Sequence, residues 1–189
     1  MKYVSHLIAT TTLTATLIIG ITLPLPAGSN APEWVVKGSG AGEFQERRVF
    51  FGVGKAENID NKSHLFSTAD CKARAALANV LYEFVDFLSN DYMAKKKGHD
   101  LAGLKNMEMI KYEQKLRAVL QISLRGLKIE EQWQDPETRA GYSCCRVSLD
   151  HVRETINKSE EISPEIKAHL NKRADQIHGM VESKPRKKK

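Results

Sequence analysis

Three cysteines, Cys71, Cys144 and Cys145, are the residues of this sequence best suited to covalent chemistry. A thiol becomes a nucleophile when a nearby base or positive charge lowers its pKa. Cys71 has Lys72 and Arg74 beside it in the sequence but no aligned histidine, so we expect no catalytic residue and no enzymatic activity. In an oxidising compartment the alternative is a disulfide from Cys71 to Cys144 or to Cys145, because a bridge between the adjacent pair would be strained.

The patterns for nucleotide and metal binding are incomplete. Residues 52–55, Gly-Val-Gly-Lys, resemble part of a phosphate-binding loop, but Val49 and Ala56 stand where that loop requires glycine and a hydroxyl residue. We expect these glycines instead to bring a strand close to a neighbouring helix or to form a bulge. Zinc needs three or four suitably spaced ligands, and the histidines are scattered: His64, His99, His151, His169 and His178. We therefore predict neither a metal site nor a cofactor.

The net charge of +6 comes from the two ends of the chain. Without Lys2 and the five basic residues of the tail, acidic and basic residues are equal in number, so we expect no nucleic-acid partner. The tail, residues 183–189, is predicted to be disordered. The alternative is a contact with anionic lipid headgroups or wall polymers through Lys184, Arg186, Lys187, Lys188 and Lys189.

Residues 1–31 have the three parts of an export signal. Lys2 precedes an apolar run from Leu7 to Leu25, and small residues follow between Ala27 and Ala31. This layout is typical of a secretory signal peptide cleaved in that last stretch. The alternative is an uncleaved anchor, because the apolar run approaches the length that spans a bilayer. In both cases we expect the body to be exported, to the periplasm or the cell envelope.

The elements of the body follow from hydrophobic spacing. Residues 32–47 are interpreted as an N-terminal segment with a glycine-rich turn at 38–42, and residues 48–55 as a buried strand. Apolar residues at three- and four-residue spacing predict a long helix over 64–93 and a second helix over 107–118. Residues 119–125 fit either a helix or a strand, because Leu120, Ile122 and Leu124 alternate with polar residues.

A hairpin and two helices complete the prediction. Residues 127–133 and 142–149 alternate around a turn at 135–138. Cys145 would then face the core and Cys144 away from it, so at most one of them is expected to be buried. Trp133 and Tyr142 are interpreted as core or rim residues of the sheet, and the alternative is an aromatic binding surface near the end of the hairpin. Asp150 or Ser148 can cap a short helix through Ile156, and a last helix starts with Ser163 as its cap and Pro164 in its first turn. The fold class is α+β, a long helix on a small antiparallel sheet with a C-terminal helix, in one domain over 48–182.

The order of these motifs resembles a known family. Residues 32–35 (Pro-Glu-Trp-Val), 51–56 (Phe-Gly-Val-Gly-Lys-Ala), an alanine-rich helix, and residues 126–138 leading through Trp133 into Asp-Pro-Glu-Thr are similar to the LPP-type, about twenty-kilodalton, bacterial outer-membrane lipoproteins. The resemblance covers about residues 32–174. It implies the fold of the amino-terminal domain of a flagellar assembly protein and a place in the envelope, without catalytic residues. The lipid-bearing cysteine of that family is absent at the expected cleavage site.

Three functions are compatible with the sequence. The first is a non-catalytic envelope protein that binds other proteins, in assembly or maintenance of a surface structure. The second is a ligand- or polymer-binding module held to an anionic surface by its cationic tail. The third is a thiol-dependent redox protein that uses Cys71, Cys144 and Cys145, which we rank last because nothing in the sequence positions a low-pKa thiolate.

Overall fold

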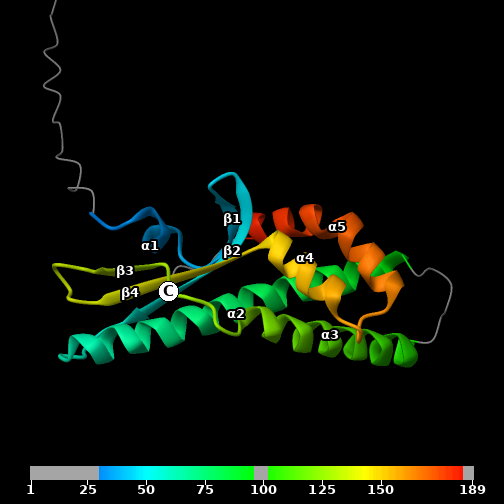
Figure 1. The fold of residues 1–189 in the computed structure, drawn as a ribbon, viewed down its shortest axis with the longest axis horizontal. Helices are drawn as coiled ribbons and strands as arrows, with labels where there is room; N and C mark the ends of the chain where they lie inside the picture. The colour runs from blue at the N-terminus through cyan, green and yellow to red at the C-terminus, as the bar shows by residue number, and fades with distance from the viewer. Residues whose placement is uncertain (1–29, 96–101, 185–189) are drawn as a thin grey trace, which may run out of the picture. The chain divides into compact units, whose positions relative to one another are not determined.

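A four-stranded antiparallel sheet and a long helix form the centre of the fold. The computed structural model describes residues 30–95 and 102–184. Its elements are α1 (Glu33–Lys37), β1 (Gly40–Phe44), β2 (Arg47–Ala56), α2 (Lys62–Lys95), α3 (Ala102–Leu124), β3 (Glu131–Gln134), β4 (Gly141–Ser148), α4 (Leu149–Lys158) and α5 (Pro164–Ser183). The strands pair in the order β1-β2-β4-β3. The predicted α+β class is confirmed (Figure 1).

The first half of α2 lies directly against one face of the sheet, because the chain has small residues where the two meet. A Cβ atom added to Gly52 would lie 2.7 Å from Cβ of Leu77, and one added to Gly54 would overlap the backbone of Ala69 and Ala73. Both alanines are fully buried. The prediction that these glycines bring a strand close to a helix is therefore confirmed, since carbon atoms do not approach so closely without bonding.

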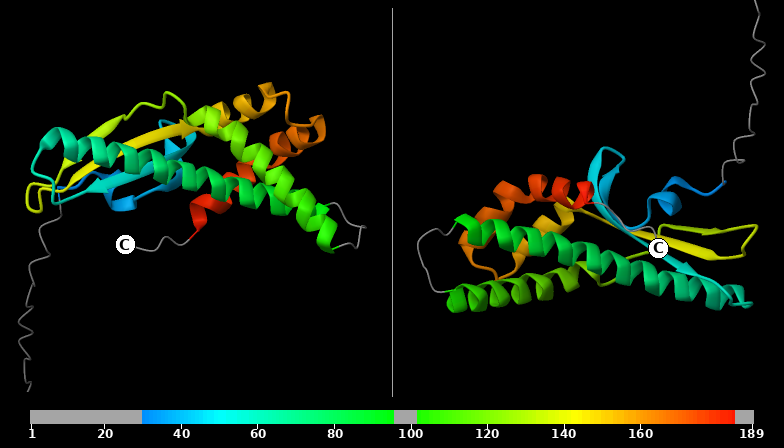
Figure 2. Two further views of the ribbon diagram at one scale, coloured as in Figure 1. Left: turned by 90° about the horizontal axis from the view of Figure 1, so that it is seen from below. Right: turned by 180° about the vertical axis from the view of Figure 1, so that it is seen from behind.

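The second half of α2 extends beyond the sheet and lies between α3 on one side and α4 and α5 on the other (Figures 1 and 2). The main apolar core follows this helix, from the sheet residue Phe50, whose ring centroid is 5.1 Å from that of Phe84, to Leu88, Leu116 and Leu170 among the helices. All apolar clusters of the described residues are built within Ala31–Lys189, which forms one compact unit. This unit therefore contains a core of its own.

Helix α3 includes the segment that the sequence leaves open between helix and strand. Residues 119–124 are helical, and Gly126, at φ 72°, follows the end of the helix. Leu116, Val119 and Leu120 are buried at helical spacing, whereas Ile122 is 54% exposed. The alternation of apolar residues that favours a strand thus depends on an isoleucine outside the core.

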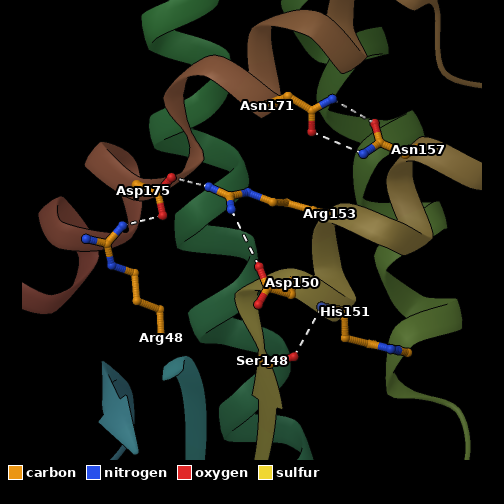
Figure 3. Close-up of polar contacts among 8 residues, drawn as sticks. All are labelled: Arg48, Ser148, Asp150, His151, Arg153, Asn157, Asn171 and Asp175. Carbon is orange, nitrogen blue, oxygen red and sulfur yellow. Dashed lines mark hydrogen bonds and ion pairs between the residues drawn. The ribbon is translucent and has the colours of Figure 1, made fainter. Parts of the chain in front are cut away.

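Helices α4 and α5 are joined to each other and to β2 by polar side chains (Figure 3). The Asp175 carboxylate of α5 accepts hydrogen bonds from Arg48 of β2 and Arg153 of α4, and the amides of Asn157 and Asn171 exchange hydrogen bonds of 3.1 and 3.2 Å. The predicted cap at the start of α4 is confirmed, because the Ser148 hydroxyl accepts a 3.1 Å bond from a backbone N–H of the first turn. Ser163 precedes α5 as predicted, without a capping side-chain bond.

The glycine-rich segment differs from the prediction, because it forms the edge strand β1 and not a turn. Gly40, Ala41 and Gly42 pair with Phe51, Phe50 and Val49. The pairing needs only backbone groups, so the lack of side chains does not prevent it. The sheet therefore begins eight residues before the predicted domain start at residue 48, and the segment around Trp34 is the short helix α1.

The first strand of the predicted hairpin is also shorter than expected. β3 begins at Glu131, so residues 127–130 precede the strand and do not belong to it. The turn at 135–138 is confirmed, because Asp135 accepts bonds from the Glu137 N–H at 2.9 Å and the Thr138 hydroxyl at 2.7 Å.

None of the helices in the described ranges 30–95 and 102–184 combines the length and apolar character that crossing a membrane requires.

Candidate functional site

The face of the sheet opposite α2 is the part of the fold left most open. Val49, Phe51 and Val53 of β2 point to this face, and their partners on β4 include Cys144 and Arg146. Among the described elements, the short helix α1 lies over it, on the side of the sheet away from α2 (Figure 1), and the end of α5 reaches its border through Glu182. Trp34 of α1 packs there with Val49, Phe51 and Cys144, in an apolar cluster separate from the main core.

A cleft of about 440 Å³ lies on this face, between α1, β1 and the end of α5. It is hollow because Gly42 of β1 pairs with Val49 without adding a side chain. A Cβ atom at Gly42 would lie 3.3 Å from the Phe51 ring and 3.8 Å from a carboxylate oxygen of Glu182. The direction of that Cβ shows that a larger side chain at residue 42 would enter the cleft.

Arg146 forms one wall of the cleft, and its own side chain is held on three sides. Its guanidinium donates hydrogen bonds of 2.6 Å to Glu130 and to Glu131, and its central carbon lies 4.1 Å from the centre of the Phe44 ring. The side chain is only 9% exposed. Burial opposes its charge, yet the two glutamates raise the pKa of Arg146 above its ordinary value. The arrangement fixes Arg146 across β2 as a rigid part of the wall.

The charges that line the cleft are mainly negative. Glu33, Glu43, Glu131 and Glu182 line it with only two basic residues, Lys37 and Arg146. Both basic residues are paired with glutamates, Lys37 with Glu33 at 2.7 Å. Aromatic and aliphatic side chains form the floor, and one of them, Phe44, is 39% exposed. Such a surface fits a ligand that carries both positive charge and apolar groups.

The cysteines do not come together in the structure. All three are unpaired thiols, so the disulfide from Cys71 to Cys144 or Cys145 is not formed. Cys71 is exposed on α2, whereas both others are fully buried. The expectation that at most one of the adjacent pair is buried is wrong, because Trp34 covers the second face. Burial raises the pKa of Cys144 to about 12 and that of Cys145 to about 11, which opposes thiolate formation.

The other residues singled out in the sequence have structural positions. Trp133 and Tyr142 pack at the rim of the open face with ring centroids 5.5 Å apart, which agrees with their interpretation as rim residues. Lys184, the first residue of the basic tail, pairs with Glu83 of α2 at 3.0 Å. Arg186, Lys187, Lys188 and Lys189 lie outside the described residues, as do residues 1–29 with the predicted export signal. Within the part of the chain that is described, no three His, Cys, Asp or Glu side chains are grouped to hold a metal.

Sequence reasoning missed most of the cleft. Glu43, Phe44 and Glu182 carry no motif, and they come from elements far apart in the chain. The available signal was the alternation of Gly40 and Gly42 with Ala41, which indicates a strand with one bare face.

Comparison with known proteins adds no relative: no family model, curated protein or solved structure matches this chain. The resemblance to the outer-membrane lipoprotein family therefore stays a prediction that rests on the order of its motifs.

Proposed function

We propose that this chain is a non-catalytic protein of the bacterial cell envelope that binds a segment of another protein in the cleft of its open sheet face. The observation that carries the proposal is the cleft itself, where one face of a small sheet is left hollow over an aromatic floor. Aromatic residues and fixed arginines are the side chains that anchor protein interfaces. Export of the domain rests on the sequence pattern of residues 1–31.

The chemistry of the cleft defines the partner segment. An excess of glutamates over basic residues remains in the cleft after Glu33 and Glu131 pair with Lys37 and Arg146. Around Trp34, Phe44 and Phe51 this excess favours lysine or arginine together with an apolar side chain. Phe44, which lines the cleft and is 39% exposed, can extend the contact to the surface around it. A small molecule is the second candidate, because a volume of about 440 Å³ lies within the range of ligand sites.

Filling the cleft tests the proposal. Gly42→Leu directs a side chain into the hollow from a backbone that does not have the left-handed φ reserved for glycine. Gly179→Leu is the matched control, because that glycine lies on the exposed side of α5 with nothing within 4 Å of an added Cβ. A photo-crosslinking amino acid replaces Phe44 in each background, in cells that make the protein. Thermal denaturation confirms that every variant is folded.

We expect a discrete crosslinked protein with the Phe44 probe, lost with Gly42→Leu and retained with Gly179→Leu. Equal crosslinking in both backgrounds, or none in either, contradicts the proposal. Native mass spectrometry of the purified protein separates the second candidate, because a bound small molecule that Gly42→Leu removes would replace the protein partner as the occupant.

A further inference from the structure

The outer face of α3 carries three large apolar side chains that nothing in the described structure covers, among exposed residues that are otherwise polar or small. Six large hydrophobic side chains of the described residues are exposed, and three of them, Met107, Ile110 and Ile122, lie on this helix with exposed fractions of 52–54%. At 100° per residue they fall on the side opposite the buried Leu116 and Leu120. Helix α3 lies on the outside of α2 in all three views (Figures 1 and 2). The side chains therefore point away from the protein.

The charged residues on the same face are positive. Lys111 and Lys115 are exposed on α3, and Arg125, the first residue after the helix, is exposed as well. Among the α3 side chains that the structure describes, the acidic one is Glu113, which is half-buried and lies 3.6 Å from Arg117. Within the described side chains of this helix, positive charges therefore lie beside Met107, Ile110 and Ile122 with no exposed acid.

This combination selects one kind of partner. A second copy of the chain is disfavoured, because pairing the two faces about a twofold axis would bring Lys111 and Lys115 against their own equivalents. A lipid surface suits a convex helix, since it needs no complementary groove. Met107, Ile110 and Ile122 can enter the acyl boundary while the long lysine side chains reach the headgroups.

We propose that the outer face of α3, formed by Met107, Ile110, Ile122, Lys111 and Lys115, rests on the surface of an anionic lipid bilayer. This contact is independent of the cleft and of the basic tail. It would hold the domain flat against a membrane without any segment of α3 crossing it.

Flotation with lipid vesicles tests the contact. The protein is residues 31–189, the unit that contains all described apolar clusters, so that the apolar N-terminal segment contributes nothing to binding. The vesicles are phosphatidylcholine alone or phosphatidylcholine with one quarter phosphatidylglycerol. One variant carries Ile110→Gln and Ile122→Gln, and another carries Lys111→Gln and Lys115→Gln. The control is Met180→Gln, which removes an exposed apolar side chain from α5. Deletion of residues 185–189 measures how much of the vesicle binding comes from the basic tail.

We expect binding to the anionic vesicles that each α3 double variant weakens at least tenfold, whereas Met180→Gln changes it less than twofold. The α3 effect should persist after the tail is deleted. The substituted side chains are exposed, so unchanged thermal unfolding is expected in every variant. Three results overturn the proposal: no binding of the unchanged protein, equal binding to neutral vesicles, or binding that only the tail deletion reduces.

Discussion

Replacing Gly54 with alanine should destabilise the protein by about 3 kcal/mol, because the new methyl group meets backbone and not a movable side chain. The added Cβ would overlap O of Ala69 and N of Ala73, and would lie 2.9 Å from the carbonyl carbon of Lys72. Overpacking against a core costs roughly 1–3 kcal/mol. The upper end applies here, since the overlap of the new methyl group with the α2 backbone can be removed only if α2 moves away from the sheet. The smaller entropy of the unfolded alanine chain offsets only about 0.4–1 kcal/mol.

Urea denaturation followed by far-ultraviolet circular dichroism measures this loss. For a domain of this size, 3 kcal/mol corresponds to a fall in Tm of about 6–12 °C, and a stability of roughly 5–15 kcal/mol keeps the variant folded. Gly179→Ala is the control, because an added Cβ there meets nothing within 4 Å and alanine stabilises a helix by about 1 kcal/mol relative to glycine. An unfolding midpoint of Gly54→Ala equal to that of the unchanged protein would refute the close contact of α2 with the sheet.

Three further outcomes follow from buried or capping groups. Ser148→Ala removes the cap of α4 and should lower the free energy of unfolding by about 1 kcal/mol; a chemical denaturation curve that does not shift would contradict the cap. Burial lowers the pKa of His178, so its neutral form stabilises the fold above an unfolded pKa near 6.5, and stability should fall as pH decreases from there. The loss between pH 7 and 5 should shrink in His178→Gln, and an unchanged slope would assign it to other groups. A thiol reagent should modify Cys71 alone in the native protein, and all three cysteines in denaturant, since Cys144 and Cys145 are buried; three reactive native thiols would disprove that burial.

The long helix and the central strand could be predicted from the sequence, because the spacing of apolar residues alone determines them. The helix predicted over 64–93 spans Lys62–Lys95, and the strand predicted over 48–55 spans Arg47–Ala56. In both cases an apolar period extends over many residues, so single exceptions do not change the result. The role of Gly52 and Gly54 was predicted for a different reason: glycines inside a strand indicate a close approach of another backbone or a bulge.

The candidate site was less accessible because it depends on what covers each face. Alternation predicts that Cys144 and Cys145 point in opposite directions, which they do, but not that Trp34 covers the outer one. Residues 119–125 fitted a strand as well as a helix because Ile122 continued the alternation of apolar residues, although its side chain is exposed in the structure. The cleft depends on Gly42 having no side chain, and the spacing of apolar residues does not predict where a missing side chain leaves a cleft.

The central strand pair has a consequence for the order in which the chain folds. Gly52 of β2 and Cys145 of β4 are neighbours but lie 93 residues apart in the sequence, and closing such a loop costs about 4 kcal/mol of chain entropy. Helices α2 and α3 lie within that loop and shorten it once formed, so we expect them to precede the sheet. During synthesis one edge of the apolar strand β2 therefore stays unpaired until residues 141–148 have been made, so we expect the incomplete chain to be prone to aggregation.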